Sequence, residues 1–153
     1  MTQYPLLFTF LDKVEGNGYL ADVAVYGRLL AVEEDGTWWT YGVNPGGLAA
    51  SGQTLPEAYT EFRASLMKVL FDIATEAPDF YAFRMEARQF FEENDEETIE
   101  EWNLAREQVR KGAINLEGMR RETAEPPRRI EIKQKQTFNP QGNAVDPQVA
   151  VAA

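Results

Sequence analysis

Apolar and polar positions follow two different periods along this chain. From residue 55 to residue 74 the apolar side chains recur at intervals of three and four, which is typical of one buried face of an α-helix. The predicted core face consists of Leu55, Ala58, Tyr59, Phe62, Leu66, Val69, Leu70 and Ile73. Thr54 and Glu57 have the spacing of a capping box, and Pro56 suits a first turn because it lacks an amide donor that would stay unpaired there. A long helix is therefore predicted to begin directly after Thr54.

The residues before this helix alternate with the shorter period of β-strands. Turn-forming residues interrupt them at residues 16–18, at Gly27 and at Asp35-Gly36, the last being a strong hairpin signal. The predicted strands cover residues 6–11, 19–26, 28–33, 37–41 and 48–51. Strands followed by one long helix favour an α+β fold, in which an antiparallel sheet of three to five strands packs on that helix and a helical C-terminal extension follows.

Two further helices are predicted after residue 77. Residues 80–91 place aromatic side chains at helical spacing. Residues 92–101 are rich in carboxylates, which are stabilised near a helix N-terminus, and Gly112 suits the C-terminal cap of the helix that follows. The apolar stripe of that helix consists of Ile99, Trp102, Ala105 and Val109. This stripe either packs on the sheet or pairs with a copy of itself, so Ile99, Trp102 and Val109 are candidate self-association residues.

The composition divides the chain into three regions. Residues 1–77 form the predicted sheet-plus-helix domain, and residues 78–119 form the helical extension. Residues 120–153 contain a basic strand candidate, with Ile130 and Ile132 on one face, and end in a tail with the composition of a flexible segment. This segment is either the strand of a DNA-binding unit, an edge strand of a sheet, or a flexible arm. An edge strand or a flexible arm is expected, because no pair of helices follows it.

Charge and composition narrow the function. The net charge is −10, and residues 1–79 carry 11 acidic and 4 basic side chains. Affinity for nucleic acid comes chiefly from Lys and Arg, so such binding is expected at most weakly, through residues 120–135, and a basic partner is favoured. The chain has no Cys and no His, which removes thiolate chemistry, the usual neutral-pH base and the commonest zinc ligand. No metal and no cofactor is therefore predicted.

The first residues do not predict export or membrane insertion. They lack the positively charged region that begins a secretory signal peptide, and Asp12 and Lys13 end the first apolar run. No apolar run approaches the roughly 20 residues that a membrane helix needs. A cytoplasmic protein is expected.

The stretch from residue 35 to residue 58 contains a succession of motifs. An Asp-Gly pair precedes an aromatic strand, a turn follows at Asn44-Pro45-Gly46-Gly47, and Gly52-x-Thr54-x-x-Glu57-Ala58 opens the helix. This succession resembles the HicB antitoxin family over about residues 25–75. It departs from the family at Gly46, where proline is usual, and at Leu48, where cysteine is common.

The resemblance implies a module similar to a reduced ribonuclease H fold without its catalytic carboxylates. HicB proteins bind and silence HicA, a small basic ribonuclease, and usually repress their own operon through a C-terminal DNA-binding part. A non-enzymatic, HicB-like antitoxin that masks a small basic toxin is therefore the expected function. The predicted partner-binding residues form the acidic and aromatic rim of the sheet: Glu33, Glu34, Asp35, Trp38, Trp39 and Tyr41. One tryptophan should be buried and the other exposed, because neighbours in a strand point to opposite faces.

Two other functions remain open at this point. The chain could be a self-associating structural or regulatory module of the same fold, with no toxin. A carboxylate-dependent nuclease is the other alternative, and it would need several carboxylates around paired metal ions. Its candidates are Asp12, Asp22, Asp35 and Asp72.

Overall fold

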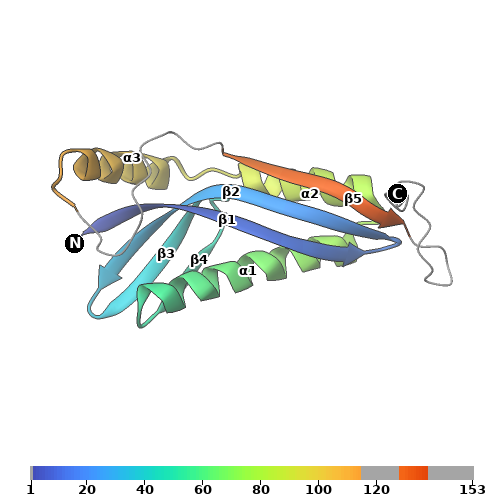
Figure 1. Ribbon diagram of the computed structural model, residues 1–153, viewed down its shortest axis with the longest axis horizontal. Coiled ribbons are helices and arrows are strands. Elements are labelled where there is room, and N and C mark those ends of the chain that lie inside the picture. Colours follow the sequence, from blue (N-terminus) through green and yellow to red (C-terminus); the bar gives the residue numbers. More distant parts are fainter. Residues whose placement is uncertain (1, 115–127, 138–153) are drawn as a thin grey trace, which may run out of the picture.

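The computed structural model describes residues 2–114 and 128–137, and within them it shows an α+β fold (Figure 1). Five antiparallel strands form one curled sheet, and three helices pack on it. The elements are β1 (Gln3–Gly16), β2 (Tyr19–Glu34), β3 (Thr37–Asn44), β4 (Ala49–Gly52), α1 (Leu55–Glu76), α2 (Phe80–Glu92), α3 (Glu96–Arg110) and β5 (Arg129–Thr137). The predicted class is thus confirmed.

The sheet is organised around β2. One edge of β2 pairs with β1 along its length, from Tyr19 opposite Gly16 to Val32 opposite Gln3. The other edge is divided, because residues 19–26 pair with β5 and residues 28–34 pair with β3. Among the described strands β5 pairs with β2 alone, so of the two expected alternatives the structure shows the edge strand and not the flexible arm.

Gly27 does not end a strand, and the prediction of two separate strands at residues 19–26 and 28–33 is wrong. The alternation of side chains continues through Gly27, which lies opposite Phe8 at the point where β2 changes partner from β5 to β3. A β-carbon at this position would collide with the carbonyl oxygen of Asn44 and approach the Phe8 ring to 2.7 Å. The glycine therefore permits a close approach of chains within the sheet, not a turn.

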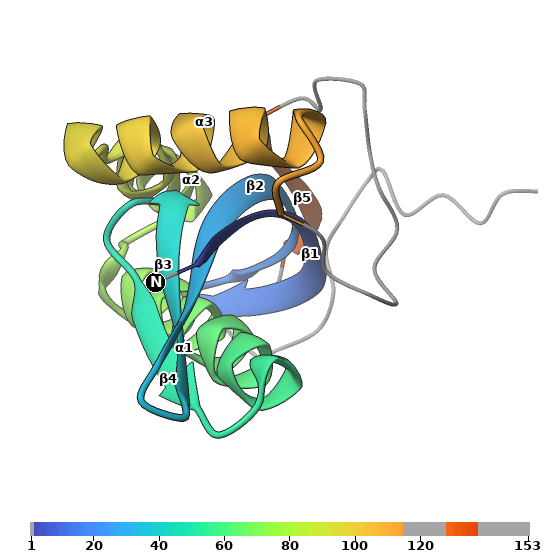
Figure 2. The ribbon, with the colours of Figure 1, turned by 90° about the vertical axis from the view of Figure 1, so that its left-hand side faces the viewer.

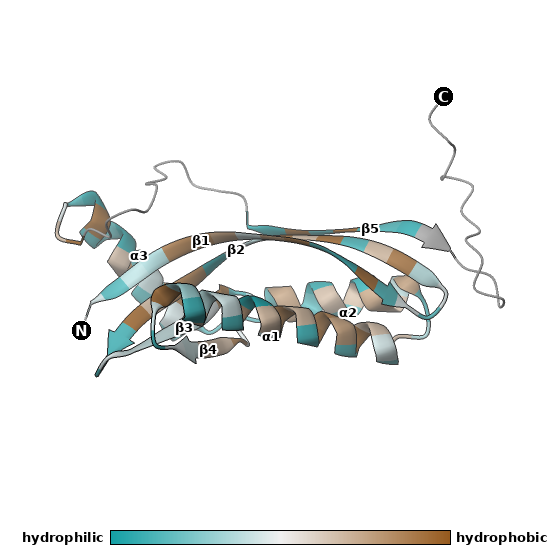
Figure 3. Cartoon of the chain, turned by 60° about the horizontal axis from the view of Figure 1, so that its bottom comes forward, coloured by the Kyte–Doolittle hydropathy of each residue, from teal (hydrophilic) through white to brown (hydrophobic). Residues whose placement is uncertain are grey.

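The main hydrophobic core lies between the sheet and the pair α1 and α2 (Figure 3). The predicted face of α1 is confirmed, since Ala58, Phe62, Leu66 and Leu70 are buried there. The cap differs in one detail. The Thr54 side chain accepts from the Glu57 amide, but the Glu57 carboxylate accepts from the Gln53 amide at 2.9 Å instead of from the Thr54 amide.

Helix α2 contributes its aromatic face to the same core. Phe80, Phe83, Ala87 and Phe91 are buried, and Ile132 of β5 joins them. This core therefore includes residues from each of the three regions 1–77, 78–119 and 120–153, whose boundaries stay predictions. The predicted flexible tail lies outside the described residues.

Helix α3 packs on the opposite face of the sheet (Figure 2). Its Trp102 and Ala105 are buried against Leu30, Val32 and Val43, which form a second, smaller core. Gly112 has a φ of 76°, as expected for the residue that ends the helix. None of the described helices combines the length and apolar character that a membrane crossing requires.

Candidate binding surfaces

The predicted rim residues are divided between the two faces of the sheet. Glu33 lies opposite Trp38, and Trp38 packs against the main core with its ring 5.6 Å from that of Tyr4. Trp39 lies opposite Val32, on the α3 side. Asp35 occupies the hairpin turn with a φ of 52°. The six residues therefore do not form one surface.

Three of the six do come together, beside α3. Trp39 and Tyr41 stack with their ring centroids 6.1 Å apart and their planes 11° from parallel. Burial raises the pKa of Tyr41, and the nearby carboxylates of Glu34 and Glu101 raise it further. The prediction that one tryptophan is buried and the other exposed is wrong, because both are half-buried, although they point to opposite faces and only Trp38 packs against a core. We call Glu34, Trp39, Tyr41 and Glu101 the acidic–aromatic surface.

Glu101 is the member that sequence reasoning missed. It belongs to the first half of α3, and its carboxylate accepts a 3.4 Å hydrogen bond from the Gln3 side chain. The sequence signal for Glu101 is its position next to Trp102. A residue beside the buried stripe of a helix lies at the edge of the contact between that helix and the sheet.

The candidate self-association residues lie mostly within the fold. Trp102 is 3% exposed, and its indole N–H donates to the carbonyl of Leu6 at 3.3 Å. Ile99 packs against the second core, and Val109 is half-buried. The stripe thus contacts the chain's own sheet, and self-association through Ile99, Trp102 and Val109 stays a prediction.

A second candidate site is an open groove of about 880 Å³ between α2, α3 and the start of β5. Its lining residues are Arg28, Asn44, Arg88, Phe91, Glu92, Asn94, Ile99, Arg128, Arg129 and Ile130. We call it the arginine groove, since it collects four arginines and one acid. No pattern in the sequence indicates this groove, because its arginines come from three distant parts of the chain.

A backbone hydrogen bond joins the two segments that carry Asn44 and Asn94 of the groove. The amide of Gly46 donates to the carbonyl of Glu93 at 3.1 Å, which joins the β3–β4 turn to the α2–α3 connection. A β-carbon on Gly46 would lie 2.6 Å from that carbonyl oxygen. A proline at this position would have no amide hydrogen to donate. Gly46 thus combines the amide donor and the small size that this contact requires.

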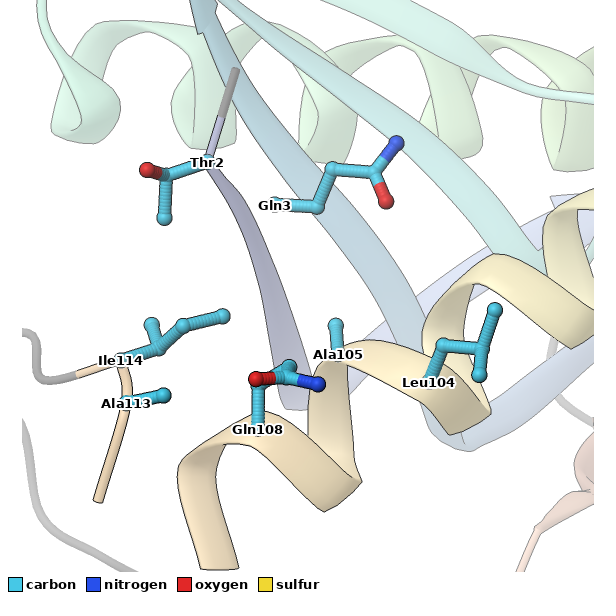
Figure 4. Close-up of a pocket in the computed structure, with 7 residues that line it drawn as sticks. All are labelled: Thr2, Gln3, Leu104, Ala105, Gln108, Ala113 and Ile114. Carbon is cyan, nitrogen blue, oxygen red and sulfur yellow. The ribbon is translucent and has the colours of Figure 1, made fainter. Parts of the chain in front are cut away.

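A smaller hollow of about 260 Å³ lies between the start of β1 and the end of α3 (Figure 4). Its lining residues are Thr2, Gln3, Leu104, Ala105, Gln108, Ala113 and Ile114. None of these side chains is charged, so the hollow offers no ionisable side chain that could act as an acid or a base.

The four aspartates considered for metal binding do not form a metal site. In residues 2–114 and 128–137, no three Asp or Glu side chains are arranged to hold an ion. Asp22 instead forms ion pairs with Lys13 at 2.9 Å and Lys135 at 3.4 Å. Burial alone would raise the pKa of Asp22, but the hydrogen bonds and charges of these two lysines outweigh it and lower the pKa.

Comparison of the chain with models of protein families, with curated proteins and with solved structures finds no match.

Proposed function

We propose that this chain is a non-enzymatic, HicB-like binding protein that captures and masks a small basic protein, such as a HicA-type ribonuclease. The observation that carries the proposal is the acidic–aromatic surface, in which two carboxylates flank a stacked tryptophan–tyrosine pair. Tryptophan and tyrosine are enriched at binding hot spots, and carboxylates beside them favour a Lys- or Arg-rich partner.

The surroundings of this surface support the same kind of partner. Glu96, Glu97 and Glu100 are exposed on the first turns of α3, which also carries Glu101. These carboxylates add negative charge beside the acidic–aromatic surface, and this charge should raise the association rate of a basic protein at low salt.

The test uses the tagged full-length chain as bait in an extract of its native host. We expect one small basic protein, whose purified form has ribonuclease activity that an equimolar amount of the chain abolishes. The double variant Glu34→Lys/Glu101→Lys should lose it, and Trp39→Ala should weaken binding about 30-fold, as for a hot spot of about 2 kcal/mol.

The matched control is Glu61→Lys/Glu76→Lys, which changes the net charge equally on exposed positions of α1. This control should retain the partner. If both double variants lost the partner equally, the interaction would depend on net charge alone and not on the acidic–aromatic surface. Recovery of only the chain itself would contradict the proposal and favour self-association.

A further inference from the structure

Strand β5 pairs along one edge only. This edge follows β2 in regular register from Arg129 opposite Tyr26 to Gln134 opposite Ala21, and no described strand lies on the other side. The sequence of β5 contains no proline, so every residue keeps its amide donor. Because every second residue of a strand points its N–H and C=O to the same side, the open edge presents a row of donors and acceptors with which an extended chain can pair.

The other two edge strands are less accessible. In β1 the carbonyl of Thr9 accepts a hydrogen bond from Arg63 of α1 at 2.9 Å. The amide of Lys13 donates to the Asp12 side chain at 2.8 Å, and Pro5 has no amide hydrogen. Strand β4 has only four residues, and α1 packs along it. Of the described strands, β5 is therefore the one best able to accept an added chain.

One face of α2 lies beside this edge, and the helix contacts β5 (Figure 1). Tyr81, Arg84, Met85 and Arg88 recur at intervals of three and four, so they share a face of the helix. Arg88 lines the arginine groove together with the start of β5, which places this face on the β5 side of α2. Tyr81 is 66% exposed and Met85 is 63% exposed. Tyrosine, methionine and arginine are residue types enriched at protein interfaces. We call this face and the open edge of β5 the β5–α2 surface.

The β5–α2 surface is positively charged, although the net charge of the chain is −10. Arg88 and Lys133 are exposed, and neither has an ion-pair partner among the described residues. Arg84 lies over the rings of Phe80 and Tyr81 and is half-buried. These three cations are therefore accessible to carboxylates of a partner.

The charge of β5 also selects among the possible partners. The strand carries three basic side chains and one acidic side chain. Like charges directly opposite each other across two strands are destabilising, so β5 of a second copy is a poor neighbour for this edge. A single-stranded nucleic acid has the right charge, but its backbone cannot continue the ladder of amide hydrogen bonds. An acidic polypeptide strand satisfies both requirements.

We propose that the β5–α2 surface binds an extended, acidic segment of a partner protein as an added β-strand. The backbone of this segment pairs with the open edge of β5, and its inward side chains lie against Tyr81 and Met85. Its carboxylates are attracted by Arg84, Arg88 and Lys133. The proposal does not depend on the acidic–aromatic surface, which has the opposite charge.

Fluorescence anisotropy of the full-length chain with a labelled peptide tests the proposal. The probe has nine residues, the length of β5, and alternates glutamate with valine. We expect this peptide to bind, and a peptide with lysine in place of glutamate to show no binding. A third peptide, with proline in place of valine, keeps the charge but cannot pair as a strand. It should bind at least about 10-fold more weakly than the probe.

Variants of the chain locate the binding. Arg88→Glu/Lys133→Glu should weaken binding of the probe at least about 10-fold. The matched control is Lys68→Glu/Lys111→Glu, which makes an equal charge change at exposed positions of α1 and at the end of α3 and should leave binding unchanged. Tyr81→Ala alters no charge and should weaken binding about 10-fold, as for an aromatic hot spot.

Hydrogen exchange of the β5 amides reports on strand addition itself. The amides that point away from β2 should exchange at least about 10-fold more slowly when the probe is bound. Absence of binding at about 1 mM, a concentration that marks very weak affinity, would overturn the proposal. So would equal weakening by the two double variants, equal binding of the proline peptide, or unchanged exchange in β5. Displacement of the probe by a lower concentration of single-stranded oligonucleotide would replace the peptide by nucleic acid as the ligand.

Discussion

Removing the hydroxyl of Tyr19 should stabilise this protein. Tyr19 is 1% exposed, and its ring packs against Phe80 and Phe83 with centroid distances of 5.8 and 5.6 Å. Its hydroxyl is buried and has no hydrogen-bond partner among the described residues. A buried polar group without a partner costs about 1–3 kcal/mol, so Tyr19→Phe should raise the free energy of unfolding by that amount at neutral pH.

The gain should also depend on pH. Burial, together with the smaller effects of the negative charges of Asp79 and Glu86, raises the pKa of Tyr19 from 10.0 to about 12. The unfolded chain therefore loses this proton near pH 10, whereas the folded chain keeps it. The free energy of unfolding of the wild-type protein therefore has its full value below pH 10 and falls as the pH rises through about 12. The loss is up to about 1.4 kcal/mol per pH unit and about 2.7 kcal/mol in total.

Urea unfolding of both proteins at pH 7, 9, 10.5 and 11.5 measures this difference. The advantage of Tyr19→Phe should be constant up to pH 9 and then widen, while other titrating groups cancel between the two proteins. Tyr81→Phe is the control, because Tyr81 is exposed on α2, the helix whose Phe80 and Phe83 pack against Tyr19. A Tyr19→Phe protein that is less stable at pH 7, or a difference that stays flat to pH 11.5, would refute the reasoning.

Two other substitutions test how α3 is held. Gly46→Pro removes the amide that donates to Glu93 and places an atom within 2.6 Å of its carbonyl oxygen, so urea unfolding should show a loss of about 1–3 kcal/mol. Trp102→Ala empties the centre of the second core and should cost about 3–5 kcal/mol by the same measurement, with retention of wild-type stability as the contradicting result.

Features set by neighbouring residues could be predicted from the sequence. Thr54 caps α1, the Asp35-Gly36 turn has positive φ angles, and Gly112 ends α3 as expected. In each case the backbone requirement is satisfied by the residue itself or by one within four positions. Local chemistry is therefore sufficient for these elements.

Features set by distant partners could not be predicted in this way. Gly27 has the composition of a breaker, but pairing with β1 on one edge of the strand overrides its local preference. Glu101 acts on the hydroxyl of Tyr41 through its charge, and Arg28 and Arg88 line one groove, although the members of each pair are about 60 positions apart. Periodicity showed that the stripe around Trp102 would be covered, but it carried no information about which surface covers it.

The acidic–aromatic surface depends on the docking of α3, and this dependence separates structural damage from loss of a contact. Glu101 of α3 completes the surface, while Trp102 on the same helix packs in the second core. Trp102→Ala should therefore lower the free energy of unfolding and weaken capture of a basic partner together. Glu101→Lys should weaken capture alone, because its side chain does not belong to the core beneath α3. If Trp102→Ala left capture at the wild-type level, the binding surface would have to lie away from α3.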